Sequence, residues 1–208
     1  DGTWGATPNG FPYQLASISN ITRKTVVIGL TSGKFAAFYG SDGGKLYVQS
    51  YTGSSWNTAQ STLSNLSSGQ VQSETSQGDD VNVVFNRWAT YDIVYVKYTY
   101  ATNSFSAETV VQASTTSTSA PVLSINTANN DLYCFWEGSP TANHIYYKKY
   151  SGGSWDANPT DWQSETSISS WYSRLSCYSQ SYSGYIGVVW TQGSTGMNVR
   201  HNYLMLPH

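Results

Sequence analysis

One phrase occurs twice in this chain, and no other feature constrains the fold as strongly. LYVQSYTGSSWN and IYYKKYSGGSWD share one pattern of aromatic, aliphatic and turn residues. In each copy a tyrosine, Tyr51 or Tyr150, precedes a tryptophan, Trp56 or Trp155, by five residues. Alternating apolar residues before the tyrosine are typical of a β-strand, and the Gly-rich turn after it reverses the chain. We therefore expect a hairpin whose tryptophan packs over the hairpin end.

Two weaker copies continue the series. Tyr100 precedes Phe105 by five residues, and Tyr203 lies near the C-terminal end of the sequence with no aromatic partner after it. Successive tyrosines are about 50 residues apart, a spacing that indicates a repeat architecture. The sequence begins with DGTWG, which resembles the GSSWN and GGSWD of the two clear copies. We therefore expect the N-terminal residues to supply the piece that the last repeat lacks.

Each repeat contains four short stretches typical of β-strands. Apolar stretches precede the tyrosines, in KFAAFYG, DVNVVFNRW, DLYCFWEG and YIGVVWTQG, and a further stretch lies before each of them. A polar stretch follows each Trp or Phe. β-branched and aromatic residues dominate, Gly, Asn, Asp and Ser separate the stretches, and no helical period is present. Four-stranded units at this spacing predict an all-β fold, a four-bladed β-propeller of four-stranded antiparallel blades.

The predicted propeller is a single domain with defined blades. Residues 1–17 are expected to form the outer strand of the last blade and to close the ring by main-chain hydrogen bonds. The blades then occupy residues 18–68, 69–119, 120–170 and 171–208. Two alternatives remain open: the chain can be a fragment of a longer propeller or half of an eight-bladed dimer. The sequence leaves completeness and oligomeric state undetermined.

The composition excludes two classes of partner. Only 11% of the residues are charged, Lys and Arg number 10 against 12 Asp and Glu, and no basic cluster exceeds Lys148-Lys149. A phosphate backbone needs a basic surface, so nucleic acid is not an expected partner. The longest apolar runs, such as VVIGL, are far shorter than the roughly 20 residues that span a bilayer. We expect no membrane span.

A hydroxyl-rich, lysine-poor composition favours a secreted or cell-surface protein. Sequons at Asn20 and Asn65 would permit glycans in that setting, although the sequence does not say whether they are used. Cys134 and Cys177 lie in apolar or aromatic strand patterns. They are expected to be free, buried thiols in preference to a disulfide.

At its two clear phrases the chain resembles the sialidase-like and lectin-like β-propeller superfamily, whose blades carry a segment of the form hYhrhhsGgsWs before the outer strand. The resemblance covers the repeat pattern of the whole chain and implies the blade, not an activity. The Asp-box of sialidases, S-x-D-x-G-x-x-W, is degenerate because both copies lack its Asp. A sialidase resemblance would also imply an arginine triad. The chain has only four arginines, Arg23, Arg87, Arg174 and Arg200, and no Arg-Ile-Pro signature.

Other catalytic chemistry has little support in the sequence. No G-x-S-x-G elbow surrounds a serine, no D-x-D-x-D-G loop is present, and the three histidines do not cluster with cysteines. Glycosidase chemistry needs two carboxyl groups roughly 5 to 10 Å apart, and Glu137, directly after Phe135-Trp136, is the acid worth following. No catalytic residue, metal or cofactor is predicted. Whether the protein is an enzyme is left uncertain, with a binding role favoured.

The ends of the second strands differ most between the repeats, and they predict a recognition surface. Aromatic rings stack on sugar rings, while amides, carboxylates and guanidinium groups bind hydroxyls. The candidate ligand-binding residues are Tyr39, Arg87, Trp88, Trp136, Glu137, Trp190 and Gln192. The competing interpretation is that these tryptophans pack between blades and their polar neighbours only end the strands.

Three functions follow from this sequence. The first is a non-catalytic binding module that recognises glycans or a surface protein, with the ligand itself undetermined. The second is a structural propeller that self-associates in a surface layer or filament. The third is a sialidase-like glycoside hydrolase.

Overall fold

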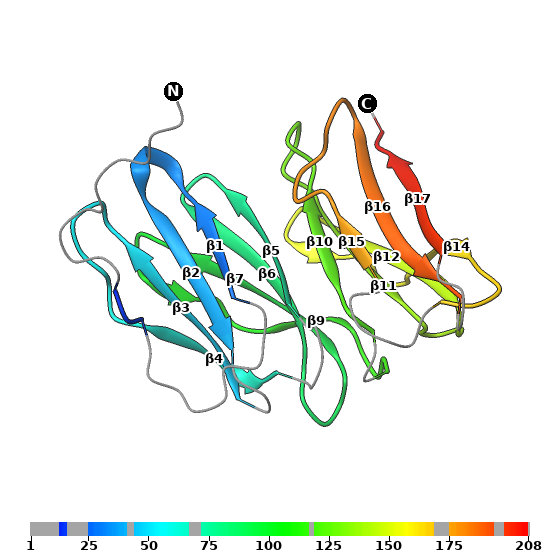
Figure 1. Cartoon of the computed structure of the whole chain (residues 1–208), viewed down its shortest axis with the longest axis horizontal. Helices are drawn as coiled ribbons and strands as arrows, with labels where there is room; N and C mark the ends of the chain where they lie inside the picture. The colour runs from blue at the N-terminus through cyan, green and yellow to red at the C-terminus, as the bar shows by residue number, and fades with distance from the viewer. Residues whose placement is uncertain are drawn as a thin grey trace.

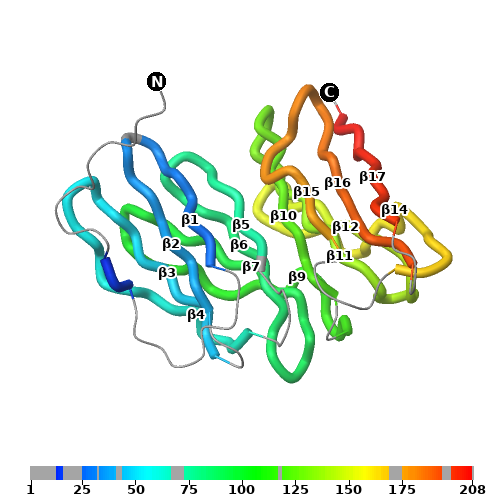
Figure 2. The backbone as a smooth tube through the Cα atoms, viewed as in Figure 1, coloured from blue at the N-terminus to red at the C-terminus, as the bar shows by residue number. Residues whose placement is uncertain are grey.

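The structure is a computed structural model of the 208-residue chain, and it describes residues 13–15, 25–40, 44–66, 72–116, 119–168, 175–193 and 198–207. Within these ranges the fold is all-β, with 17 strands in four antiparallel sheets and one short 3-10 turn, η1, at Thr31–Gly33. Figures 1 and 2 show the sheets following one another in chain order. The described part contains no helix that is long and apolar enough to cross a membrane. The predicted all-β class is confirmed.

The four sheets are built alike, from strands that pair with their neighbours in the sequence. The first sheet contains β1 (Val26–Gly29), β2 (Phe35–Gly40), β3 (Lys45–Tyr51) and β4 (Gln60–Asn65). The second contains β5 (Gln72–Gln77), β6 (Asp80–Asn86), β7 (Ile93–Thr99), β8 (Ser104–Phe105) and β9 (Thr109–Gln112). The third contains β10 (Val122–Ile125), β11 (Leu132–Glu137), β12 (His144–Ser151), β13 (Ser154–Trp155) and β14 (Thr160–Ser164). The fourth contains β15 (Leu175–Cys177), β16 (Tyr185–Gln192) and β17 (Asn198–Met205).

Each pair of successive sheets encloses an apolar core. Phe85 in β6 belongs to the core between the first and second sheets, whereas its neighbour Val84 belongs to the core between the second and third. In β11, Trp136 likewise faces the second sheet and Phe135 faces the fourth. Successive side chains of a strand point to opposite faces, so a sheet packed on both sides must be apolar at nearly every position. This explains the uninterrupted apolar runs in the sequence.

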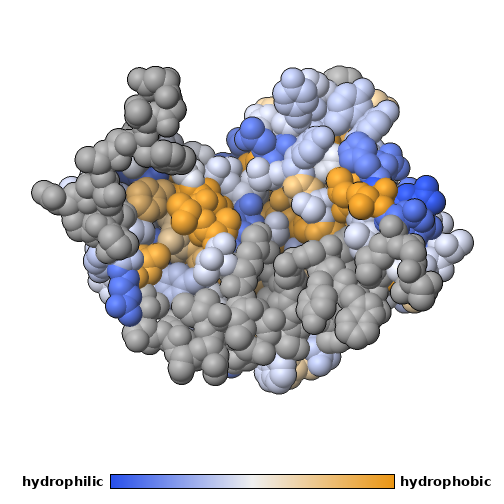
Figure 3. Space-filling view, in the orientation of Figure 1, coloured by the Kyte–Doolittle hydropathy of each residue, from blue (hydrophilic) through white to orange (hydrophobic). Residues whose placement is uncertain are grey.

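The first strands of all four sheets surround one cavity. β1, β5, β10 and β15 contribute residues to its wall, and its volume is about 750 Å³. The backbone N–H of Leu123 donates to Ser73 Oγ at 3.0 Å, and Thr75 Oγ1 donates to the carbonyl of Ser179 at 2.5 Å. Figure 3 shows this face hollowed between the first two and the last two sheets, with hydrophobic surface on both sides. Four sheets whose first strands converge on one cavity form a propeller-like fold.

The repeated phrases form the predicted hairpins. Tyr51 pairs with Trp56 and Tyr150 pairs with Trp155. The Trp155 ring also lies 5.6 Å from the ring of Tyr95 in the second sheet, measured between centroids. These tryptophans therefore pack against the hairpin, as predicted. Trp155 also packs against the preceding sheet.

In the two weaker copies, the five-residue spacing assigns the tyrosine position to the wrong residue. Phe105 pairs with Tyr98, not with Tyr100, because the second hairpin is longer than the first and third. In the fourth sheet Leu204 packs into the core against the third sheet, whereas Tyr203 is 55% exposed. Neighbouring residues of a strand face opposite ways, so Leu204 and not Tyr203 takes the place of Tyr51 and Tyr150.

Ring closure by the N-terminal residues is not confirmed. Within the described residues β17 pairs only with β16, and the predicted closing segment lies outside them except for residues 13–15. Those three residues are not in a strand, and the Tyr13 ring stacks on Trp56 of the first sheet at 5.4 Å. The predicted blade boundaries also stay predictions. Asn20 lies outside the described residues, and Asn65 ends β4.

Cys134 and Cys177 are thiols and are not joined in a disulfide. Cys134 is buried in the third sheet, and burial raises the pKa of its thiol well above the ordinary value. Cys177 is partly buried in β15. The fold therefore does not depend on a bond between them.

Buried tyrosines make the fold sensitive to alkali. Burial raises the pKa of Tyr133 from 10.0 to about 12, and it also raises the pKa values of Tyr39, Tyr95 and Tyr98. These groups stabilise the folded state fully below about pH 10, and this contribution is lost as the pH rises toward 12, because the unfolded chain then releases protons that the folded chain retains. We expect the melting temperature to fall from about pH 10 upward. Tyrosinate absorbance should show a class of tyrosines that ionises only with unfolding; a single ordinary titration would contradict the prediction.

Candidate binding site

The predicted site residues lie at or just after the ends of the second strands, in all four sheets. The aromatic rings among them are mostly buried. Trp136 is fully buried, stacks on Tyr146 and donates its Nε1–H to the carbonyl of Ser139 at 2.8 Å. Tyr39 is buried and stacks on Tyr47. A buried ring offers little surface on which a sugar could stack.

Trp190 and Gln192 belong to a partly buried polar network that joins the third and fourth sheets. Trp190 Nε1 donates to Glu165 Oε1 at 3.1 Å, and Gln192 Nε2 donates to Glu165 Oε2 at 2.7 Å. Arg200 Nε donates to Gln192 Oε1 at 2.7 Å. Glu137 is also buried, and its carbonyl oxygen accepts from Ser119 Oγ at 2.7 Å. These contacts are those of polar residues that secure strand ends.

Trp88 is the exception, because 46% of its surface is exposed. It lies on the turn of residues 87–92, which joins β6 to β7. Its backbone N–H donates to the carbonyl of Asn65 in the first sheet at 2.8 Å. Ala89 and Tyr91 in the same turn have φ values of 70° and 55°, a left-handed conformation that residues other than glycine seldom adopt. Such a conformation persists only where surrounding contacts enforce it.

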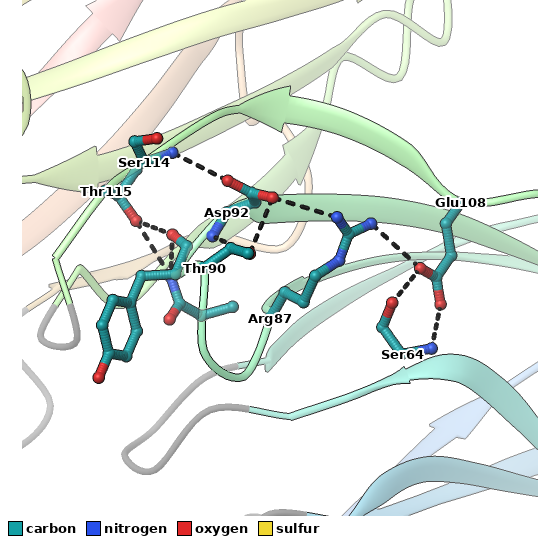
Figure 4. A network of polar contacts seen from close by, with 9 residues as sticks. Ser64, Arg87, Thr90, Asp92, Glu108, Ser114 and Thr115 are labelled. Atoms are coloured by element: carbon teal, nitrogen blue, oxygen red, sulfur yellow. Dashed lines mark hydrogen bonds and ion pairs between the residues drawn. The ribbon is translucent and has the colours of Figure 1, made fainter.

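Arg87 is the centre of those contacts (Figure 4). Its Nη1 binds Asp92 Oδ2 at 3.1 Å, and its Nη2 binds Glu108 Oε2 at 3.3 Å. Ser64 in β4 donates to the same Glu108 through both its backbone N–H and its hydroxyl. Because Ser64 is in the first sheet and the other three belong to the second, the guanidinium group and its carboxylates link two sheets. Hydrogen bonds to charged groups are stronger than neutral ones.

A second set of bonds holds the far side of the turn. Thr90 Oγ1 donates to Asp92 Oδ2 at 2.9 Å, and the Ser114 N–H donates to Asp92 Oδ1 at 2.9 Å. The carbonyl of Tyr91 accepts from Asn86 Nδ2 at 3.1 Å and from the hydroxyl of Thr115. The turn is therefore rigid, and it presents an exposed indole ring at the junction of two sheets.

Asp92 and Glu108 also meet part of the geometric requirement for glycoside hydrolysis, since both bind one arginine. Their side chains are 13% and 9% exposed. Each of their four carboxylate oxygens accepts a hydrogen bond from Ser64, Arg87, Thr90 or Ser114. A general acid or base has to reach a proton of the substrate. Asp92 and Glu108 therefore act as structural groups that hold the turn, and not as a general acid or base.

In the part of the chain that the structure describes, the remaining titratable groups do not gather into a site. Within the described ranges no group of three or more His, Cys, Asp and Glu residues could hold a metal ion. His144 Nδ1 lies 2.8 Å from Asp161 Oδ2 in an exposed pair. Of the four arginines, Arg23 and Arg174 lie outside the described residues, and Arg87 and Arg200 are bound to the partners named above.

Sequence reasoning missed an aromatic cluster on the fourth sheet. Tyr178, Tyr182, Tyr185 and Tyr203 are exposed and, with Gly187 and His201, line a cavity of about 360 Å³. The Tyr178 ring lies so close to Gly187 that a Cβ there would be 2.7 Å from it. The three tyrosines of YSQSYSGY could have pointed to this cluster. A strand pattern, however, does not show which face of the sheet is exposed to solvent.

No family model and no curated protein sequence matches this chain. Solved structures with a similar fold include AofleA from Arthrobotrys oligospora, with a TM-score of 0.62 and 12% identity over 87% of this chain and 52% of that chain. The leech intramolecular trans-sialidase matches with a TM-score of 0.52 and 11% identity, over 90% of this chain and 30% of that chain. The Aleuria aurantia lectin matches with a TM-score of 0.51 and 13% identity, over 88% of this chain and 64% of that chain. The chain thus spans about half the length of AofleA, and identities this low show a common fold alone.

Trp136 and Trp88, two of the three predicted site tryptophans, differ in burial, and the difference predicts different losses of stability. Trp136→Ala should lower the free energy of unfolding by about 3–5 kcal/mol, because it leaves a cavity between the second and third sheets. Trp88→Ala should change it by less than about 1 kcal/mol, because the indole is half exposed. Urea denaturation followed by tryptophan fluorescence and circular dichroism measures both. Equal losses in the two variants would contradict this assignment of core and surface.

Proposed function

We propose that the protein is a non-catalytic glycan-binding module and that Trp88 is its main contact with sugar. The observation that carries this proposal is the half-exposed indole on a turn that ion pairs hold rigidly. A sugar ring has an apolar face that stacks on an aromatic ring, and a ring that is already fixed loses little conformational entropy when it binds.

The surroundings of Trp88 suit a neutral ligand rich in hydroxyl groups. The hydroxyl of Thr90 and the backbone of the turn are close to the ring in sequence. Arg87 is paired with two carboxylates, so it offers no free positive charge to an anionic ligand.

The comparisons support a glycan ligand in general terms only. One similar structure is a lectin in complex with Fucα1-6GlcNAc, and another is a trans-sialidase in complex with 2,7-anhydro-Neu5Ac. For this chain the sugar, a secreted or cell-surface location and a protein partner on a cell surface are parts of the proposal. Hydrolysis is a weaker second candidate, because every oxygen of the two carboxylates that bind Arg87 accepts a hydrogen bond within the protein.

A glycan array with the purified chain tests the proposal. Trp88→Ala should reduce the signal about tenfold or more, because a lost stacking contact and its buried area together exceed about 1.4 kcal/mol. Trp88→Phe should retain part of the signal, since a smaller aromatic face remains.

Leu63→Ala is a matched control, because Leu63 is a large exposed side chain in β4 at 77% exposure. It should leave the array signal unchanged. An unaltered signal for Trp88→Ala would remove Trp88 from the site. A wild-type protein that binds no glycan on the array would contradict the glycan-binding function itself.

A further inference from the structure

Asn65 lies directly opposite Trp88 at the junction of the first and second sheets. Leu66 forms an antiparallel bridge with Arg87, and the Trp88 N–H donates to the carbonyl of Asn65 at 2.8 Å. The residues next to such a bridge are also opposite each other, and they point to the other face. Leu66 is fully buried in the core between the two sheets. Asn65 and Trp88 therefore share the outward face, where both are exposed.

Lys45 extends this row by one strand. It pairs with Asn65 in the register of β3 and β4, so its side chain lies on the face that Asn65 and Trp88 share. Its neighbour Leu46 points the other way, into the core between the first and second sheets. None of the ion pairs among the described residues involves Lys45. Three neighbouring segments thus carry an ammonium group, an amide and an indole in one line.

The charges at this junction balance. Arg87 is paired with Asp92 and Glu108, which leaves one negative charge in excess (Figure 4). Lys45 adds a positive charge that offsets it. Two cations and two carboxylates give a rim without net charge, and such a rim favours an uncharged ligand over an anionic or a cationic one. The ammonium group of Lys45 then serves as a hydrogen-bond donor to hydroxyl oxygens.

The three groups supply different contacts for a sugar, and the row is longer than one sugar ring. The indole offers an apolar face, the amide both donates and accepts hydrogen bonds, and the ammonium group donates up to three. Neighbouring strands are about 4.8 Å apart, so the backbone positions of Trp88 and Lys45 are separated by roughly 10 Å. A single ring stacked on Trp88 therefore reaches Asn65 but leaves Lys45 without a contact.

We propose that Asn65 and Lys45 are specificity-determining residues of the glycan site at Trp88, and that this site takes two linked neutral sugar units. One ring stacks on Trp88 and binds Asn65 through a hydroxyl group. The second ring accepts hydrogen bonds from Lys45 through its own hydroxyl groups. This inference rests on the glycan-binding function proposed above, and it adds the length and the charge of the ligand.

An array that carries glucose, galactose, mannose and N-acetylglucosamine, each as the single sugar and as its disaccharide, tests the length of the site. The chain is produced in a host that adds no N-glycans, because Asn65 is the first residue of a sequon. The disaccharide of the sugar that binds best should bind about tenfold more tightly than the single sugar, as expected for added hydrogen bonds to a charged group.

Two substitutions separate the contacts. Lys45→Met keeps the length of the side chain and removes its donors, so the signal of the disaccharide should fall about tenfold, to that of the single sugar. Asn65→Ala should weaken the binding of both by about fivefold, because the amide contacts the first ring. The backbone bond from Trp88 to residue 65 is retained in both variants, and thermal melting should be unchanged. Lys149→Met is the matched control, because Lys149 is in β12 of the third sheet and should not affect either signal.

Two results would overturn the inference. Equal binding of single sugars and disaccharides, with no effect of Lys45→Met, would place Lys45 outside the site. A signal confined to acidic glycans and lost at high salt concentration would mean that Lys45 binds an anionic group and not a neutral second ring. In both cases Trp88→Ala would still reduce binding, which distinguishes them from a failure of the glycan-binding function itself.

Discussion

Each sheet in this protein has two apolar faces, and each face needs another sheet to cover it. In β6, Phe85 is buried against the first sheet and Val84 against the third. Trp136 and Phe135 divide in the same way in β11. The chain satisfies this requirement by placing similar sheets side by side around a cavity lined by their first strands. Among the described residues the requirement is not met at the two ends of the series. There Trp56 stacks on Tyr13 and not on another sheet, and the tyrosines of the fourth sheet are exposed.

Polar side chains hold the sheets together where this apolar packing ends. Arg87 joins Asp92 and Glu108, and through Glu108 it joins Ser64 of the preceding sheet. Glu165 joins the third and fourth sheets through Trp190. Buried charges are costly unless they are paired and hydrogen-bonded, and these are. Their rigidity has a functional consequence, because the network under the 87–92 turn is what fixes the only exposed ring among the predicted site tryptophans.

Much of the fold could be predicted from the sequence, and the errors have one cause. The strands around Phe85, Phe135 and Val188 were evident from β-branched and aromatic residues between turn residues. The spacing placed Tyr100 and Tyr203 in positions that Tyr98 and Leu204 hold. A strand has a side-chain period of two, so an error of one residue moves a side chain to the opposite face. Counting the residues between a tyrosine and the next aromatic residue does not reveal that one hairpin is longer than the others.

The sequence by itself determined the all-β class, four strand groups and the packing role of the hairpin tryptophans, because these depend on local alternation and turn residues. Only the tertiary structure decided which tryptophans are exposed. Trp88 and Trp136 both occur at the end of a second strand, and the sequence does not distinguish them. Trp88 is nevertheless half exposed, whereas Trp136 is fully buried. Exposure depends on which sheet lies opposite, and Glu108 and Ser64, which hold the turn under Trp88, come from distant parts of the chain. No local pattern contains that information.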